Sequence, residues 1–245
     1  MTVSRRIVLS ALTVALADAW LSRGYAQDRH GAAREALLRE IESDMRATAG
    51  ETGRSTLSDV VRRAMQSVPR ERFVPSHLAF AAYENRPLPI GDGQTISQPF
   101  IVALMTELLQ PKPNHIVLEV GTGSGYQAAV LAECVAKVYS VEIVASLAQR
   151  ARAALDAAGY RNVETRIGDG YLGWPEAAPF DGIVVTAAPD HVPPRLIEQL
   201  KPGGRLVIPV GPHRATQELL VIEAGRDGRA LTRRTIAVRF VPLTR

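Results

Sequence analysis

The apolar positions of the chain change their spacing after residue 113. From there, short apolar runs, which are typical of buried strands, alternate with stretches in which apolar residues recur at helical spacing. The predicted strands are residues 115–120, 137–142, 163–167, 180–186, 205–210, 218–223 and 235–241. The predicted helices are residues 126–133, 144–158 and 194–200. This alternation predicts an α/β fold with a doubly wound, mostly parallel sheet, and the last three strands, which lack long helices between them, predict an antiparallel edge.

Residues 27–112 show helical periodicity instead. We expect a polar helix at 32–49, a second helix that Ser58 caps and Pro69 ends, and a third helix at 98–109. These helices are expected to form a lid or support for the α/β core at residues 113–245. Residues 27–245 together are therefore predicted to be one compact domain.

The first 26 residues have the pattern of an export signal. A basic start at Arg5 and Arg6 precedes an apolar run over residues 7–21, and small residues stand just before Gln27, as at a cleavage site. The paired arginines resemble a twin-arginine signal. Asp18 interrupts the apolar run, which leaves an uncleaved arm or a membrane anchor as the alternative. We expect a periplasmic or exported protein if this leader functions, and a cytoplasmic protein otherwise.

Composition and charge exclude several classes of protein. Of the 245 residues, 46% are apolar and 22% are charged, which is an ordinary globular composition. The 29 basic and 25 acidic residues give a formal net charge of +4, and the first 26 residues contribute +2 of it, from three arginines and one aspartate. So small a remainder, without a basic stripe, argues against a nucleic-acid partner. No stable membrane partner is expected apart from the export machinery.

The cysteine and histidine content argues against a metal site. The single cysteine, Cys134, excludes an internal disulfide framework and a cysteine-based metal cluster. The five histidines lack the spacing of metal ligands. We therefore expect no metal in this protein.

The predicted strand at 115–120 leads directly into a glycine-rich loop with the sequence Gly121-Thr122-Gly123-Ser124-Gly125. A strand, a glycine loop and a helix form a nucleotide-type pocket at the carboxyl end of a parallel sheet, where glycines let the backbone approach a ligand closely. The loop departs from the dinucleotide fingerprint because its third glycine comes one position early.

Acidic residues at three predicted strand ends favour a cationic ligand in this pocket. Glu119, two residues before the loop, is expected to border the cleft, where it would repel a pyrophosphate. Glu142 ends the second strand, where an acid accepts hydrogen bonds from both hydroxyls of a ribose. Asp169, beside Gly170, is placed to accept a hydrogen bond from an adenine amino group. S-Adenosyl-L-methionine, which carries two cationic groups and no phosphate, fits this set. A solvated or arginine-paired Glu119 and a turn-forming Asp169 are the alternatives.

Seven segments of the chain then match the pattern of one enzyme family. They are residues 69–75, 88–99, 117–127, 168–174, 178–181, 185–188 and 238–243. The sequence Gly-Gln-Thr-Ile-Ser-Gln-Pro at 93–99 is more specific than the glycine loop, which many methyltransferases share. Through these segments, residues 69–245 closely resemble the protein-L-isoaspartate (D-aspartate) O-methyltransferases, whose Rossmann-like fold binds S-adenosyl-L-methionine.

This resemblance implies the reaction and its partners. A methyl group would pass from S-adenosyl-L-methionine to the free carboxylate of an L-isoaspartyl residue in a damaged protein or peptide, and cyclisation of the ester to a succinimide would start repair. The resemblance places Ser97 at the active site. Together with the residues argued above, the expected cofactor site consists of Glu119, Gly121, Thr122, Gly123, Glu142, Asp169 and Gly170.

Ser97 is expected to orient the acceptor carboxylate by donating a hydrogen bond. No general base is needed, because a carboxyl group with a pKa of about 4 is already ionised at neutral pH. The alternative is that the Ser97 hydroxyl caps the helix beginning near residue 98, and both roles can coexist. Val74 and Ile96 are expected to contact the peptide backbone or the methyl-bearing region, and Thr186 either faces the substrate or ends its strand.

Two other functions stay open on the sequence alone. The scaffold also suits a methyltransferase that acts on another carboxylate acceptor. It equally suits an exported binding protein that has lost catalysis, because S-adenosyl-L-methionine is made in the cytosol and an exported enzyme would need a supply.

Overall fold

The computed structural model of this protein describes residues 30–212, 215–225 and 229–245. The chain divides into a unit of residues 1–36 and a unit of residues 37–245, and the second unit contains every strand of the sheet. The predicted export signal at 1–26 lies outside the described residues. In the part of the chain that is described, no helix combines the length and apolar character that crossing a membrane requires.

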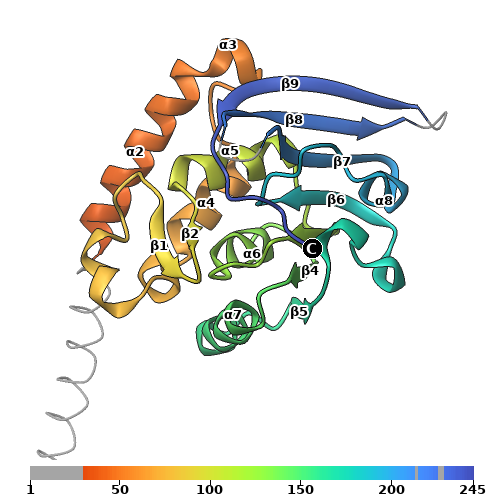
Figure 1. The fold of residues 1–245 in the computed structure, drawn as a ribbon. Coiled ribbons are helices and arrows are strands. Elements are labelled where there is room, and N and C mark those ends of the chain that lie inside the picture. Colours follow the sequence, from red (N-terminus) through yellow and green to blue (C-terminus); the bar gives the residue numbers. More distant parts are fainter. Residues whose placement is uncertain (1–29, 213–214, 226–228) are drawn as a thin grey trace, which may run out of the picture. The chain divides into compact units, whose positions relative to one another are not determined.

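A seven-stranded sheet with the order β5-β4-β3-β6-β7-β8-β9 organises the second unit (Figure 1). Its strands are β3 (Ile116–Val120), β4 (Lys137–Glu142), β5 (Val163–Ile167), β6 (Phe180–Val185), β7 (Leu200–Val210), β8 (Gln217–Ala224) and β9 (Ala230–Val238). The strands from β5 to β7 pair in parallel, whereas β8 pairs antiparallel with both of its neighbours. The predicted parallel sheet with an antiparallel edge is confirmed. The strand order reverses beside β3, and open α/β sheets bind ligands at the carboxyl ends of the strands at such a point.

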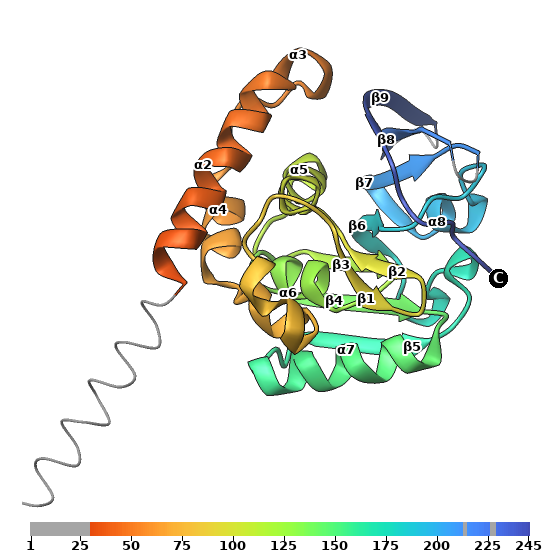
Figure 2. The same cartoon turned by 60° about the vertical axis from the view of Figure 1, so that its left-hand side comes forward.

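The two faces of the sheet are covered unequally. Along β3, Val117 belongs to one hydrophobic cluster, whereas Leu118 and Val120 belong to another, as the alternation of side chains along a strand requires. The first cluster packs under α4 (Asp59–Ser67), α5 (Pro99–Leu109), α6 (Tyr126–Ala132) and α7 (Ala145–Ala158). Figure 2 shows α7 running alongside β5. The second cluster is covered by α8 (Pro194–Glu198) and by 3₁₀ helices at Gly170–Leu172 and Pro175–Ala177.

The helices before the sheet begin with α2 (Gly31–Ala47) and α3 (Ala49–Thr52), followed by α4 and by 3₁₀ helices at Arg70–Phe73 and Ser76–Ala81. Ser58 stands at the N-cap position of α4, as expected, but its hydroxyl caps no backbone N–H group. It donates instead to the buried carboxylate of Glu107 at 2.8 Å, and its N–H group donates to the same oxygen. Ser58 therefore ties α4 to α5.

A two-stranded hairpin of β1 (Leu88–Gly91) and β2 (Gln94–Ile96) precedes α5, and the periodicity of the sequence did not predict it. Its two-residue turn consists of Asp92 and Gly93, which both have positive φ angles, of 53° and 70°. An Asp-Gly pair is a strong signal for such a turn, because few residue pairs adopt this conformation at low cost. The hairpin fixes where the chain enters α5.

Two strands differ from their predicted bounds by more than one residue at an end. β7 begins at Leu200 rather than at residue 205, because the expected loop at 201–204 continues the strand after a register shift opposite β6. β9 covers residues 230–238 rather than 235–241, because its first half is exposed on the edge of the sheet and carries no continuous apolar run. The chain after residue 238 is thereby free to leave the sheet edge, and Val241 and Leu243 hydrogen bond to Ala188.

Candidate active site

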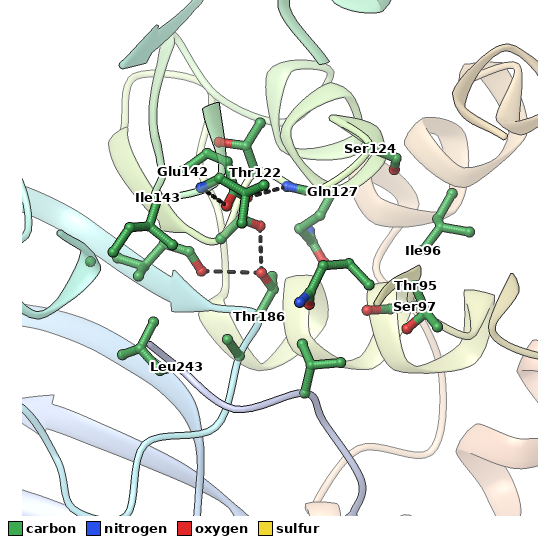
Figure 3. Close-up of a pocket in the computed structure, with 18 of the residues that line it drawn as sticks. Thr95, Ile96, Ser97, Thr122, Ser124, Gln127, Glu142, Ile143, Thr186 and Leu243 are labelled. Carbon is green, nitrogen blue, oxygen red and sulfur yellow. Dashed lines mark hydrogen bonds between the residues drawn. The ribbon is translucent and has the colours of Figure 1, made fainter. Parts of the chain in front are cut away.

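A cavity lies at the carboxyl ends of β3, β4 and β6, where the strand order reverses. Its wall includes eight of the predicted site residues: Ile96, Ser97, Gly121, Thr122, Gly123, Glu142, Gly170 and Thr186. They come from the end of the β1–β2 hairpin, from the glycine loop and from three strand ends. In Figure 3, Thr122 and Glu142 lie on one side of this cavity, and Thr95 and Ser97 lie on the other.

The glycine loop is shaped by a contact that only glycine permits. Gly121 has a φ angle of +97°, and a Cβ atom added there would lie 2.5 Å from the hydroxyl oxygen of Thr186. That hydroxyl donates to the carbonyl oxygens of Gly121 at 2.6 Å and Val120 at 3.1 Å. Thr186 therefore directly follows β6, holds the loop through its hydroxyl and lines the cavity. The loop then leads into α6, whose N-cap is Gly125.

Glu142 fixes the opposite edge of the loop. One of its carboxylate oxygens accepts a hydrogen bond from the N–H group of Gly123 at 2.8 Å, and the other accepts one from Val144 at 2.9 Å. The side chain is buried, with 7% of its surface exposed, yet it lines the cavity. Each carboxylate oxygen has two lone pairs, so each can accept a further hydrogen bond from a ligand hydroxyl.

Glu119 does not line the cavity, contrary to the prediction that it borders the cleft. On β3 its side chain shares the sheet face of Val117, beneath α6, and it has no exposed surface. Ser140 donates a hydrogen bond to one of its oxygens, and the Ser140 hydroxyl lies 2.6 Å from that of Thr122, which does line the cavity. Burial raises the pKa of Glu119 to about 8. The residue is therefore mainly a neutral acid at pH 7, linked to the cavity only through these two hydroxyls.

Asp169 and Val74 also lie outside the wall of this cavity. The carboxylate of Asp169 accepts a hydrogen bond from the N–H group of Tyr171 at 2.8 Å, which fits its alternative role as a turn residue. The predicted contact between Asp169 and an adenine stays a prediction. Val74 packs against the first hydrophobic cluster, which lies under α4 to α7. Its position therefore does not support the expected contact with the peptide. Gly170 does line the cavity, and a Cβ atom there would lie 2.5 Å from a methyl carbon of Val120.

Ser97 lies between β2 and α5, and its hydroxyl does not cap the helix. The N-cap position of α5 belongs to Gln98, and no side chain caps it. The capping interpretation is therefore wrong in this structure. The carbonyl oxygen of Ser97 accepts a hydrogen bond from Arg70 at 2.8 Å, which holds the main chain while the side chain stays available to the cavity.

Several cavity residues were not predicted from the sequence. Thr95, Ser124, Gln127, Ile143 and Leu243 all contribute to the wall. Their positions next to predicted site residues or motifs were the available signal. Gln127 is held by a hydrogen bond from its side-chain amide to the hydroxyl of Thr106 at 2.9 Å, which joins α6 to α5.

Other candidate residues have structural roles. Asp181 accepts hydrogen bonds from the N–H group of Ile116 and from the ammonium group of Lys201, both at 2.8 Å, so it joins β6 to β3 and β7. Cys134 is buried, and burial raises the pKa of its thiol to about 12. Across the described residues, no group of three or more histidine, cysteine or acidic side chains is arranged to hold a metal ion.

Comparisons with known proteins identify the family of this chain. The family model of the protein-L-isoaspartate (D-aspartate) O-methyltransferases matches residues 48–245. Protein-L-isoaspartate O-methyltransferase 2 of Syntrophobacter fumaroxidans is 57% identical over 221 residues, which are 90% of this chain and 90% of that protein. Protein-L-isoaspartate O-methyltransferase 1 of Cupriavidus necator is 52% identical over 97% of this chain and 90% of its own length.

Solved structures show the same likeness. A protein-L-isoaspartate O-methyltransferase superposes with a TM-score of 0.73 at 30% identity, covering 85% of this chain and 65% of that one. The Plasmodium falciparum beta-aspartate methyltransferase in complex with S-adenosyl-L-homocysteine superposes with a TM-score of 0.71 at 25% identity, covering 88% and 98%. Since the family model and the relatives match most of its length, this chain belongs to the protein-L-isoaspartate (D-aspartate) O-methyltransferase family.

Proposed function

We propose that the glycine loop, Glu142 and Ser97 carry out the family's reaction in this chain. That reaction transfers a methyl group from S-adenosyl-L-methionine to the free carboxylate of L-isoaspartyl residues in damaged proteins or peptides and so starts their repair. The observation that carries the assignment of roles is the placement of Glu142 and Ser97 in the wall of one cavity.

The residues around the glycine loop fit S-adenosyl-L-methionine. Glu142 presents a buried carboxylate to the cavity, already fixed by two backbone N–H groups and able to accept from ribose hydroxyls. Gly121 and Gly170 keep the cavity wall free of side chains where a Cβ atom would collide with Thr186 or Val120. When bound, this cofactor supplies a methyl group made electrophilic by its sulfonium.

Ser97 lies across the cavity from Glu142, and its proposed role is to hold the acceptor. Its hydroxyl donates a hydrogen bond to one oxygen of the substrate carboxylate, while the other oxygen stays free to attack. The carboxylate is ionised at neutral pH, so the reaction needs no proton acceptor. Alignment of the reacting groups and exclusion of water then lower the barrier, and such positioning contributes about 7–11 kcal/mol in favourable cases.

The decisive experiment is transfer of a labelled methyl group to paired peptides. Two peptides of one sequence, with L-isoaspartate or L-aspartate at the same position, are incubated with the full chain and S-adenosyl-L-methionine. We expect label only in the isoaspartyl peptide. Methylation of a different carboxylic acid, with neither peptide labelled, would favour another acceptor. Failure to bind the cofactor in isothermal titration would favour a binding protein that has lost catalysis.

We also propose that residues 1–26 direct export, through a signal of the twin-arginine type. The support is the sequence: Arg5 and Arg6 precede an apolar run that small residues close. A twin-arginine route carries folded proteins, so a chain with cofactor already bound would be a possible cargo. Cell fractionation of the full chain and of a variant with Arg5→Lys and Arg6→Lys tests this. Export of the first and cytoplasmic retention of the second is the expected result, whereas equal cytoplasmic amounts of both would contradict it.

A further inference from the structure

A second cavity, with a volume of about 540 Å³, adjoins the cavity of the candidate active site, which is called the cofactor cavity below. The two share Thr95, Ser97, Thr186 and Val241, so they meet at the residue that is proposed to hold the acceptor carboxylate. The methyl donor is proposed to bind beside Glu142 in the cofactor cavity. The second cavity is then the space that remains for the peptide carrying the isoaspartyl group. Its volume is in the range of ordinary ligand sites.

Among the residues that the structure describes, the wall of the second cavity is almost entirely uncharged. Apolar side chains and neutral hydrogen-bonding groups make up most of it: Pro87, Thr95, Ser97, Gln98, Ile101, Thr186, Thr216, Ala237, Val238, Phe240 and Val241. Arg239 is the one charged residue among the described residues of this wall. It follows the end of β9 and is exposed.

Other arginines of the antiparallel edge are engaged within the protein. Arg234 pairs with Glu218 at 3.2 Å, Arg205 pairs with Glu223 at 3.0 Å, and Arg233 donates to the carbonyl oxygen of Thr52 at 2.8 Å. Arg239 makes no ion pair or side-chain hydrogen bond with the residues that the structure describes. Its guanidinium is therefore a positive charge beside the acceptor position that is left for a ligand.

We propose that Arg239 pairs with a carboxylate of the protein substrate close to the isoaspartyl residue, so that the enzyme prefers isoaspartyl sites with an acidic neighbour. This inference rests on the proposed placement of the acceptor at Ser97. Consecutive residues of an extended peptide are about 3.3 Å apart, so residues next to the isoaspartyl group also lie in or at the mouth of the second cavity. A guanidinium matches the geometry of a carboxylate, with which it forms two parallel hydrogen bonds.

The test compares peptides that differ in one neighbouring residue. Each carries a central L-isoaspartate, and Glu, Gln or Lys is placed in turn at the two positions before it and the two after it. The full chain, Arg239→Gln, Arg239→Glu and Arg234→Gln are assayed for kcat/KM on every peptide. Arg234→Gln is the matched control, because it removes the same charge from an arginine that lines neither cavity.

For the unaltered chain we expect kcat/KM to be about 3–5-fold higher with Glu than with Gln in at least one position, as for an exposed ion pair, and lowest with Lys. The difference in kcat/KM between the Glu and Gln peptides should come from KM. It should decrease at high salt, because salt screens exposed charges. Arg239→Gln should abolish the preference and Arg239→Glu should reverse it, whereas Arg234→Gln should keep it.

Two results would overturn the inference. The first is equal kcat/KM for Glu and Lys at all four positions in the unaltered chain. The second is a preference for Glu that survives Arg239→Glu or that disappears in Arg234→Gln. In both cases the peptides are still methylated, so the proposed function stands. If no isoaspartyl peptide were methylated, the proposed function itself would fail, and this inference with it.

Discussion

The guanidinium of Arg70 donates a hydrogen bond to the main-chain carbonyl oxygen of Ser97 at 2.8 Å. Arg70 has no exposed surface; it also donates to the carbonyl oxygen of Ala82 at 2.9 Å and lies 4.8 Å from the ring centre of Tyr126. Burial lowers the pKa of Arg70 to about 10, so the side chain is still charged at neutral pH. One buried cation thus joins the hairpin end that carries Ser97 to the first residue of α6.

Replacing this cation should cost both stability and turnover. Arg70→Met removes two charge-assisted hydrogen bonds and leaves two carbonyl groups without a donor, so we expect the free energy of unfolding to fall by about 2–4 kcal/mol. Urea denaturation measures the first effect, and kcat with an isoaspartyl peptide measures the second. Arg70→Lys keeps the charge but lacks the forked donors, so it should fall between Arg70→Met and the unaltered chain. An Arg70→Met protein with unchanged unfolding and unchanged kcat would show that the contact is dispensable.

Ser97→Ala should separate orientation from stability. Loss of the hydroxyl leaves the acceptor carboxylate poorly oriented, and we expect kcat to fall by ~10–1000-fold with little change in cofactor affinity. The melting temperature should stay the same, because the hydroxyl caps no helix. Steady-state kinetics and thermal unfolding of the same preparation check both statements.

Ser124→Ala is the control for Ser97→Ala. Ser124 also lines the cavity, but it belongs to the glycine loop, where its hydroxyl accepts a hydrogen bond from the N–H group of Tyr126 at 3.3 Å. We expect its kcat to stay close to that of the unaltered chain. Equal losses of kcat in both variants would mean that the hydroxyl of Ser97 has no special role.

Glu142→Ala should weaken cofactor binding. The substitution removes the carboxylate proposed to accept from the ribose, and hydrogen bonds to charged groups contribute about 1.5–3 kcal/mol each. Isothermal titration with S-adenosyl-L-methionine gives the dissociation constant. Urea denaturation shows whether the loss of the hydrogen bonds to Gly123 and Val144 has also unfolded the loop. An unchanged dissociation constant would count against the ribose assignment.

Glu119 should make the stability of the protein depend on pH. Its pKa rises from 4.5 to about 8 on folding because burial disfavours the charged form. Between these two values the folded state holds a proton that the unfolded state has lost. The free energy of unfolding therefore falls as pH rises from about 5 to about 8 and is flat, for this group, outside that window.

Glu119→Gln removes this titration and keeps the size and hydrogen-bonding capacity of the side chain. We expect its stability relative to the unaltered chain to increase by on the order of 3 kcal/mol between pH 5 and pH 8. Urea denaturation at several pH values measures it. Parallel pH curves for the two proteins would show that Glu119 does not change its protonation on folding.

The parallel core of the fold was predictable from the sequence because its strands alternate with helices at short spacing, and because β3 and β6 at its centre are mostly apolar. β4 and β5 have their predicted bounds, and α7 ends before Gly159 as expected. The edge strand β9 was shifted, since a strand exposed at a sheet edge has no apolar pattern to follow. The hairpin that delivers Ser97 was missed because its strands are short, although Asp92-Gly93 marks its turn.

The candidate site was predicted well where a motif fixes the backbone. It was predicted less well where the alternation along a strand decides on which face of the sheet a side chain lies. The glycine loop and Glu142 line the cavity as expected. Glu119 was assigned to the cleft from its place in the chain, but the alternation along β3 turns it beneath α6. The sequence did not indicate that Arg70 contacts Ser97, because the two positions are 27 residues apart in the chain.

The contact between Gly121 and Thr186 links two distant positions of the chain. The space next to the α-carbon of residue 121 is filled by the hydroxyl of residue 186, which also fastens the loop. Residue 121 also has a φ angle of +97°, which disfavours any side chain, so a smaller residue at 186 would release the loop without admitting a larger one at 121. Glycine should consequently be retained at 121 among homologous proteins, and engineering that widens this cleft has to begin elsewhere in its wall.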